Sequence, residues 1–271
     1  MKNQSFIGAK QKASLIDLNI PSNFSGKLIV FIHGYMGFKD WGCWYLVEDY
    51  FTELGFGFCK YNVSHNGCST EDSLNFVDLE AFAENNYTKE CEDFQAVLSF
   101  IGEQNKPFPE IYVIGHSRGG GIALLQSKDE IIKKVATWAT ISDIGSRFPN
   151  GEALTEWKEK GYYSRLNGRT NQKMRHNYSQ YIDFLVNRNN LDIRQAATEN
   201  TKPLLLIHGD ADTSVDIREG KELAEWSGKE LHIIEGAAHT FGSSHPWEKE
   251  ALPDELRLVC QLTAKFFLER N

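Results

Sequence analysis

Short apolar runs recur along the chain and are separated by amphipathic segments. The runs are rich in β-branched residues and are bounded by glycine, proline or polar residues, which predicts buried strands at 27–32, 57–63, 110–114, 135–142, 203–208 and 230–234. An earlier stretch, 13–20, alternates in part and predicts a half-exposed strand. Helical spacing predicts helices at 41–54, 88–104, 122–125, 221–226 and 253–269. Strands that alternate with helices indicate an α/β fold with a mostly parallel sheet covered on both faces.

Residues 145–200 interrupt this alternation, because no apolar run there is long enough for a buried strand. Aromatic residues are mixed with arginines instead: Trp157, Tyr162, Tyr163, Tyr178, Tyr181 and Phe184 among Arg147, Arg165, Arg169, Arg175 and Arg188. Such a segment is either a helical surface insertion or a cap whose aromatic side chains wall a substrate pocket, and the two are compatible. We therefore expect one domain over 1–271, with a core of 1–145 and 200–271 and a cap insertion at about 146–199.

Length and charge narrow the classes of protein. A chain of 271 residues fits one α/β domain, and a net charge of −8 without a basic block argues against nucleic acid or an anionic membrane as partner. No apolar run approaches the length of a membrane span, and the N-terminus lacks the apolar core of a signal peptide. The five cysteines are scattered and show no Cys-x-x-Cys spacing, which favours reduced thiols. We expect a cytoplasmic protein, and its oligomeric state stays open.

A Gly-His-Ser-Arg-Gly motif lies at 115–119, between the predicted strand at 110–114 and the predicted helix. This Gly-x-Ser-x-Gly pattern is the nucleophile elbow, in which a strained strand-to-helix turn exposes the serine hydroxyl. Side chains at Gly115 and Gly119 would collide with the neighbouring helix and strand. Ser117 would also lie at a helix N-terminus, whose partial positive charge favours an anion.

A serine hydroxyl needs a base to take its proton, and that base needs a third group to orient it. Asp212 follows the predicted strand at 203–208, and His239 follows the last predicted strand. The chain order Ser, Asp, His is that of the α/β-hydrolase arrangement. Because each residue follows a different strand, we expect all three to meet at one edge of the sheet.

Together with His-Gly-Tyr-Met-Gly at 33–37, these motifs make the chain resemble the α/β-hydrolases, and more narrowly their serine aminopeptidase-like and small-esterase branch. The resemblance implies the α/β-hydrolase fold with a small helical cap. It also implies a role for each site residue: Ser117 as nucleophile, Asp212 as acid, His239 as base, and the backbone N–H groups of Tyr35 and Arg118 as the oxyanion hole.

Other residues compete for these roles. Asp210 and Asp143 are alternative acids, although the pattern His-Gly-x-x-Asp favours Asp212. His245 is an alternative base. His33 and His116 are interpreted as structural, the former as a support for the oxyanion loop. His65 and Cys68 are candidates to line the pocket, and Cys68 is also a weak alternative nucleophile.

The predicted reaction is acyl transfer to water through an acyl-enzyme, most simply by a carboxylic ester hydrolase acting on small or medium acyl groups. A peptidase or amidase is the alternative, and its substrate amine would need a carboxylate such as Asp72, Glu80 or Glu84. A catalytically idle ligand-binding protein is a third possibility. No metal or other cofactor is implied, because the histidines lack the spacing of a zinc site. A serine nucleophile argues against dehalogenase and epoxide hydrolase chemistry.

Overall fold

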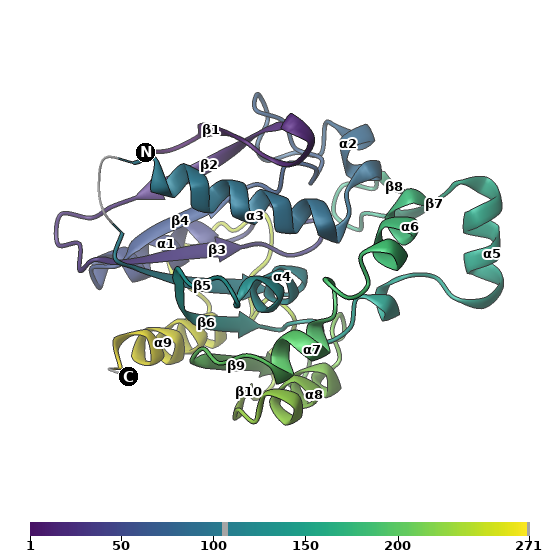
Figure 1. Cartoon of the computed structure of the whole chain (residues 1–271). Coiled ribbons are helices and arrows are strands. Elements are labelled where there is room, and N and C mark those ends of the chain that lie inside the picture. Colours follow the sequence, from purple (N-terminus) through teal and green to yellow (C-terminus); the bar gives the residue numbers. More distant parts are fainter. Residues whose placement is uncertain (105–107, 270–271) are drawn as a thin grey trace.

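An eight-stranded sheet forms the centre of the molecule in the computed structural model, which describes residues 1–104 and 108–269 (Figure 1). Its strand order is β1-β2-β4-β3-β5-β6-β9-β10. The strands from β4 to β10 are parallel, whereas β1 and β2 are antiparallel additions at one edge, so the predicted mostly parallel sheet is confirmed. The strands are β1 (Gln4–Ile7), β2 (Ala13–Asn19), β3 (Lys27–Ile32), β4 (Gly57–Tyr61), β5 (Glu110–His116), β6 (Ile132–Trp138), β9 (Leu204–Gly209) and β10 (Leu231–Ile234).

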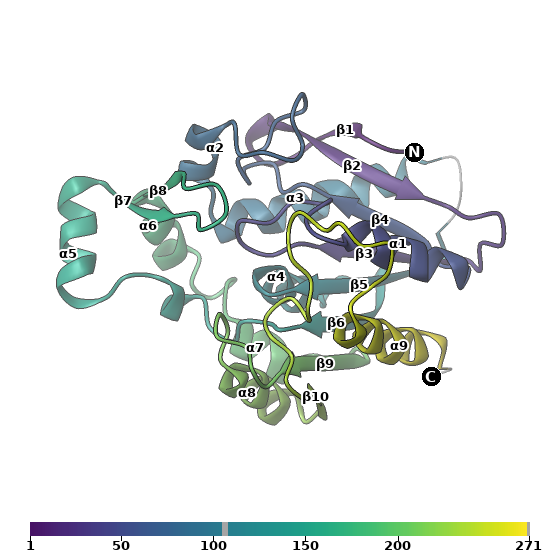
Figure 2. The same ribbon diagram turned by 180° about the vertical axis from the view of Figure 1, so that it is seen from behind.

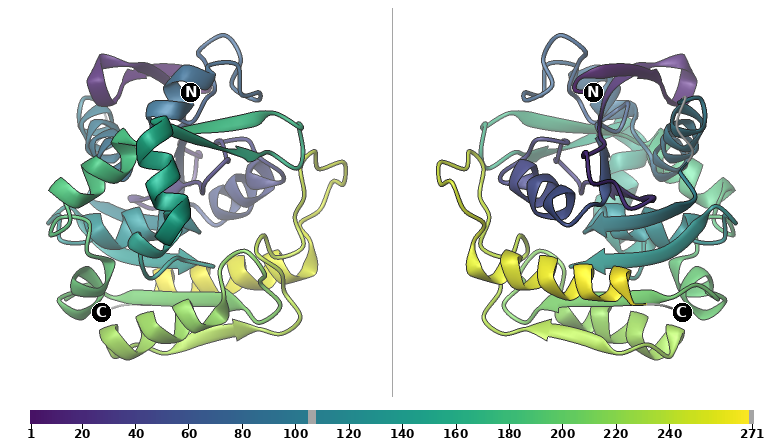
Figure 3. Two further views of the ribbon diagram at one scale, coloured as in Figure 1. Left: turned by 90° about the vertical axis from the view of Figure 1, so that its right-hand side faces the viewer. Right: turned by 90° about the vertical axis from the view of Figure 1, so that its left-hand side faces the viewer.

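Helices cover both faces of this sheet (Figures 1 and 3). One face carries α3 (Tyr87–Gly102), α4 (Arg118–Gln126), α7 (Ile193–Thr198) and α8 (Ile217–Ser227), and the other carries α1 (Trp44–Glu53) and α9 (Asp254–Leu268). Successive side chains of a strand point to opposite faces, so Val30 packs with α3 and α4 while Phe31 packs with α1. The central strands are uninterrupted apolar runs because both of their faces are buried.

Two short elements near the N-terminus differ from the sequence prediction. Strand β1 was not predicted, because Phe6 is its only buried residue and so it carries no alternating pattern. The prediction that the strand at 13–20 is half exposed was wrong, since residues 14–18 of β2 are buried. The reason is that both faces of β2 are covered: Ile16 and Leu18 pack in the core on the α3 face, and Asp17 on the other face pairs with the buried Lys39. The 3-10 helix η1 (Ala9–Gln11) connects the two strands, and α2 (Leu79–Glu84) lies within the loop predicted at 64–86.

The chain between β6 and β9 extends beyond the carboxyl ends of the parallel strands (Figures 1 and 2). It contains the 3-10 helix η2 (Gly145–Arg147), α5 (Gly151–Lys160), β7 (Tyr162–Leu166), β8 (Lys173–Asn177), α6 (Ser179–Val186) and α7. Besides the expected helices, β7 and β8 form an antiparallel hairpin that the sequence did not predict. Most residues of β7 and β8 are exposed, so the hairpin has no apolar run to reveal it.

Candidate active site

Ser117 lies at the turn between β5 and α4, and its backbone has the left-handed φ of 57° that marks a strained turn. The two motif glycines allow α4 to lie close to β5 and to the neighbouring strand β3. A Cβ at Gly115 would lie 2.4 Å from the Gly119 carbonyl oxygen in α4, and one at Gly119 would lie 2.3 Å from the Ile32 carbonyl oxygen in β3. The predicted collisions with the helix and with the strand are therefore confirmed.

Replacing Gly119 with alanine is expected to lower the free energy of unfolding by more than about 3 kcal/mol, because the clash is with backbone that cannot move without shifting β3. Urea unfolding followed by circular dichroism measures the change. Gly102→Ala is the matched control: this helix-end glycine has no atom within 4 Å of an added Cβ, so its replacement should be neutral or stabilise by up to about 1 kcal/mol. Equal stability of the two variants would contradict the expectation.

The structure brings Ser117, His239 and Asp212 into a hydrogen-bonded row. The Ser117 Oγ lies 3.0 Å from His239 Nε2, and His239 Nδ1 lies 2.7 Å from Asp212 Oδ2. Asp212 follows β9 and His239 follows β10, so residues from separate strands meet at the carboxyl edge. A carboxylate only accepts hydrogen bonds, so His239 Nδ1 carries the proton and Nε2 is free to accept one from the serine.

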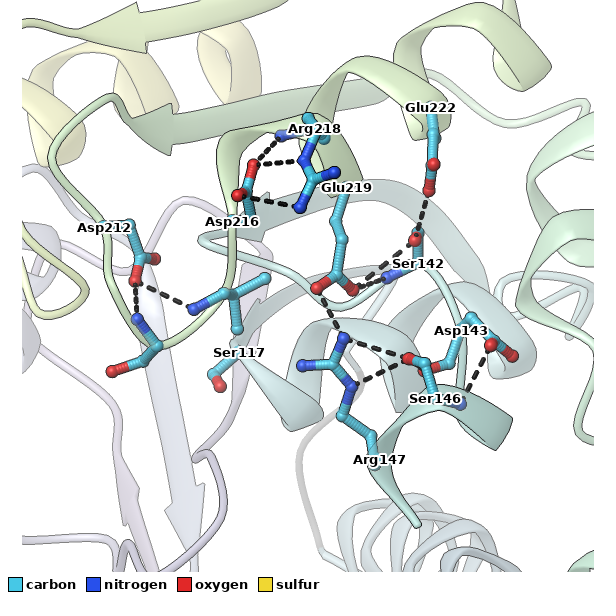
Figure 4. A network of polar contacts seen from close by, with 12 residues as sticks. Ser117, Ser142, Asp143, Ser146, Arg147, Asp212, Asp216, Arg218, Glu219 and Glu222 are labelled. Carbon is cyan, nitrogen blue, oxygen red and sulfur yellow. Dashed lines mark hydrogen bonds and ion pairs between the residues drawn. The ribbon is translucent and has the colours of Figure 1, made fainter. Parts of the chain in front are cut away.

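The Asp212 carboxylate is fully covered and well supplied with donors (Figure 4). Its Oδ1 accepts hydrogen bonds from the N–H groups of Ser214 (2.8 Å) and Val215 (2.9 Å), and His208 Nε2 lies 3.4 Å from Oδ2. Burial alone would raise the pKa of Asp212, but the donors His208, His239 and the Val215 N–H outweigh it and hold that pKa below its ordinary value. Asp212 therefore stays ionised at neutral pH.

The loop that carries Tyr35 lies directly against the serine. A Cβ at Gly34 would be 3.0 Å from the Ser117 Cβ. His33 fixes this loop, since its Nδ1 donates to the Gly34 carbonyl oxygen and its Nε2 accepts the Val63 N–H. Within the described residues, the N–H groups of Tyr35 and Arg118 donate to no protein acceptor. Both are thus available to a substrate oxygen.

The other candidate acids and bases bind backbone N–H groups elsewhere. Asp210 accepts from Gly236, Asp143 from Gly145 and Ser146, and His245 from Gly42. His116 donates to the His239 carbonyl oxygen through Nε2, and its ring lies 4.8 Å from the His239 ring. Its contacts fit the structural interpretation, because they hold the loop that carries His239.

Ser117, His239, Tyr35 and Ser214 line two cavities. The first, which we call the cap-side cavity, has a volume of about 230 Å³, and the insertion contributes Arg147, Phe148, Tyr163, Arg165, His176 and Gln180 to it. The second, the tryptophan-side cavity, has a volume of about 500 Å³ and includes Met36, Trp41, Trp44, Asn167, Arg169 and His245. A scissile bond at Ser117 would therefore have space on both sides, one for the acyl group and one for the leaving group.

Several candidates from the sequence lie outside both cavities. The described residues that line the two cavities do not include His65, Cys68, Asp72, Glu80 or Glu84. Burial raises the pKa of the Cys68 thiol to about 12, so this cysteine is a poor nucleophile at neutral pH. Most aromatic side chains of the insertion pack on one another around Trp157, and only Phe148 and Tyr163 line the cap-side cavity.

Sequence reasoning missed a relay that ties the insertion to the Tyr35 loop. The Tyr35 hydroxyl donates to His176 Nε2 at 2.7 Å, and His176 Nδ1 donates to Gln180 Oε1 at 3.2 Å. Gln180 in turn donates to the Ala83 carbonyl oxygen. Burial lowers the pKa of His176 to about 4, which keeps its ring neutral and able to accept from Tyr35. No motif surrounds His176, so only the fold reveals this contact.

Four of the buried histidines have lowered pKa values, and these make the free energy of unfolding depend on pH. Burial lowers the pKa of His33, His65 and His176 to about 4, and that of His116 to about 3. In the unfolded chain each of these imidazoles binds a proton below about pH 6.5. In the native state they bind it only at about pH 4 and below. The free energy of unfolding should therefore be highest above pH 6.5 and should fall as the pH is lowered towards 4. Each histidine contributes a slope of up to about 1.4 kcal/mol per pH unit.

Asp93 opposes this trend by one proton, because burial raises its pKa to about 6. The expected net result is a lower midpoint of urea unfolding at pH 5 than at pH 7. A higher midpoint at pH 5 would contradict the neutral state of these rings.

A mostly parallel sheet with a serine at a strand-to-helix elbow, followed in the chain by aspartate and histidine at the same edge, defines the α/β-hydrolase class. The sequence model described as the alpha/beta hydrolase family matches residues 29–251, and the chain belongs to this family.

Solved structures share the fold at low sequence identity. Est1E from Butyrivibrio proteoclasticus with bound ferulic acid has a TM-score of 0.74 and 20% identity, with 97% of each chain covered. A putative hydrolase from Agrobacterium vitis S4 has a TM-score of 0.72 and 15% identity, again with 97% of each chain covered. The esterase domain of a Rhodothermus marinus protein has a TM-score of 0.63 and 16% identity, with 97% of this chain and 95% of that chain covered.

No curated protein matches the chain by sequence. In the part of the chain that the structure describes, no helix is long and apolar enough to cross a membrane.

Proposed function

We propose that the protein is a serine hydrolase that cleaves carboxylic esters of small or medium acyl groups through an acyl-enzyme. The observation that carries the proposal is the row of contacts from Ser117 Oγ through His239 to the ionised Asp212. This row supplies a hydroxyl at the wall of both cavities, a base that can accept its proton, and a carboxylate that orients the base and stabilises its charged form.

In the proposed reaction, Ser117 Oγ attacks the ester carbonyl carbon while its proton passes to His239 Nε2. The resulting oxyanion accepts hydrogen bonds from the N–H groups of Tyr35 and Arg118. Collapse of the intermediate breaks the bond to the alcohol, which takes the proton from His239 and leaves. A water molecule then gives a proton to His239 and attacks the acyl carbon. The second intermediate releases the acid, and the proton returns to Ser117.

The cavities favour an ester over the N-terminus of a peptide. An aminopeptidase-like site needs a carboxylate to bind the free amine, and the candidates Asp72, Glu80 and Glu84 do not line either cavity in the described chain. The cap-side cavity carries arginines instead, which would repel an ammonium group. Esterases among the structural relatives agree with this preference, although at their low identity they share the fold alone.

Labelling with a fluorophosphonate tests the nucleophile. The wild-type protein should be labelled at neutral pH and Ser117→Ala should not, whereas Ser214→Ala, which removes another cavity-lining serine, should be labelled like the wild type. Absence of labelling of the wild type would favour an idle ligand-binding protein. A panel of 4-nitrophenyl esters and aminoacyl 4-nitroanilides then decides between an esterase and a peptidase, and faster cleavage of the anilides would overturn the ester assignment.

A further inference from the structure

Three arginines line the cap-side cavity beside Ser117 and His239. They are Arg118 at the elbow, Arg147 in η2 and Arg165 in β7. Of the described residues that line this cavity, none is an aspartate or a glutamate. The concentration of positive charge is notable in a chain whose net charge is −8.

Arg118 has a donor to spare. Its Nη2 lies 2.8 Å from Glu90 Oε1, and its guanidinium carbon lies 3.8 Å from the centre of the Tyr87 ring. The side chain is buried, with 8% of its residue surface exposed, and its Nε has no hydrogen-bond partner in the described part of the protein. An unpaired buried donor destabilises the folded protein, and an anion bound to this guanidinium would offset that cost.

The other two arginines leave one positive charge uncompensated. Arg147 pairs with Glu219, which also accepts the Ser142 N–H and is thereby fixed (Figure 4). Arg165 donates to the Arg147 carbonyl oxygen at 3.2 Å and has no carboxylate partner among the residues described. Three guanidinium groups at the cavity therefore face two carboxylate partners, Glu90 and Glu219.

We infer that the substrate carries a compact anionic group, a carboxylate or a phosphate, on the part that enters the cap-side cavity. The inference rests on the proposed ester hydrolysis and names its substrate class. Guanidinium groups present planar pairs of donors that match carboxylate and phosphate oxygens. A cavity of about 230 Å³ is below the usual range for drug-sized ligands, so a short anionic chain fits better than a large one.

Two pairs of substrates test the charge preference. On the acyl side, kcat/KM is compared for mono-4-nitrophenyl adipate and 4-nitrophenyl hexanoate, which share a leaving group and a six-carbon acyl chain. On the alcohol side, 4-acetoxybenzoate and 4-acetoxyphenyl phosphate are compared with neutral 4-acetoxybenzamide. A preference for the anionic ester of roughly tenfold on one side is expected, since a charge-assisted hydrogen bond is stronger than a neutral one. The second comparison also separates carboxylate from phosphate.

Arg165→Gln tests the assigned residue. It should lower kcat/KM for the preferred anionic ester about tenfold and change the neutral ester much less, so that the preference largely disappears. Arg175→Gln is the matched control, because Arg175 lies in the same hairpin, stacks on Tyr162 and lines neither cavity among the described residues; it should keep the wild-type preference.

Equal rates for charged and neutral esters on both sides, in a protein that the fluorophosphonate labels, would overturn the inference and leave the proposed function standing. A preference that persists in Arg165→Gln would overturn the assignment of Arg165. If no ester is cleaved and no label attaches, the proposed function fails and the inference fails with it.

Discussion

Replacing Ser117 with alanine is expected to lower kcat for 4-nitrophenyl ester hydrolysis by about 10⁴- to 10⁶-fold, while the protein stays folded. The substitution removes the attacking oxygen and one hydrogen bond to His239, and it leaves the main chain of the elbow in place. The two N–H groups and the cavities remain, so a small residual rate above that of water is expected. Steady-state kinetics with each enzyme at matched concentration measure the loss.

Ser214→Ala is the control for this result, because Ser214 lines both cavities and its contact with Asp212 is through its backbone N–H. Its kcat should stay within about threefold of the wild-type value, because replacing a side chain that makes no buried hydrogen bond usually has a small effect. Wild-type activity in Ser117→Ala would remove the basis of the proposed mechanism.

Replacing Asp212 with asparagine is expected to lower kcat by about 10⁴-fold. The amide oxygen can still accept the N–H groups of Ser214 and Val215, so the loop should keep its shape. The amide nitrogen then faces His239 Nδ1, which loses its acceptor. The imidazole is expected to change tautomer, so that Nε2 carries a proton and cannot take one from Ser117. Kinetics and urea unfolding together separate this loss of activity from a loss of fold.

Asp210→Asn is the matched control, since Asp210 lies two residues earlier and accepts the Gly236 N–H. Its activity should stay within about tenfold of the wild type, because it does not orient the base. A larger loss in Asp210→Asn or Asp143→Asn than in Asp212→Asn would assign the acid to another residue.

The central strands and the elbow were predictable because their signals are local. Strand β3, with bounds at Lys27–Ile32, is an uninterrupted apolar run because helices cover both of its faces. The motif around Ser117 carries its own geometric requirements, and the chain order of Asp212 and His239 restricts where their loops can lie. Local sequence therefore led to the residues that the structure brings together.

Other features depend on contacts between distant segments and leave no local pattern. The pairing of Tyr35 with His176 spans 141 positions. Lys60 is another case, because it lies in a strand yet is only 1% exposed, and it is neutralised by Glu48 from α1 and by Asp40 from the preceding loop. Sequence spacing cannot show that such groups meet. Burying one of them is costly unless its partner is buried beside it, and that depends on how distant segments pack.

The relay from Tyr35 to His176 and Gln180 has a consequence for how this enzyme can diversify. Ser117, Asp212 and His239 lie in turns and loops that follow strands β5, β9 and β10 of the sheet. Arg147, Tyr163 and Arg165 come from the inserted segment. Substitution or exchange of that segment would thus change the residues that line the cap-side cavity and leave the proposed catalytic residues in place. The exception is position 176. A replacement segment without a hydrogen-bond acceptor there would leave the Tyr35 hydroxyl without its partner and disturb the loop beside the serine.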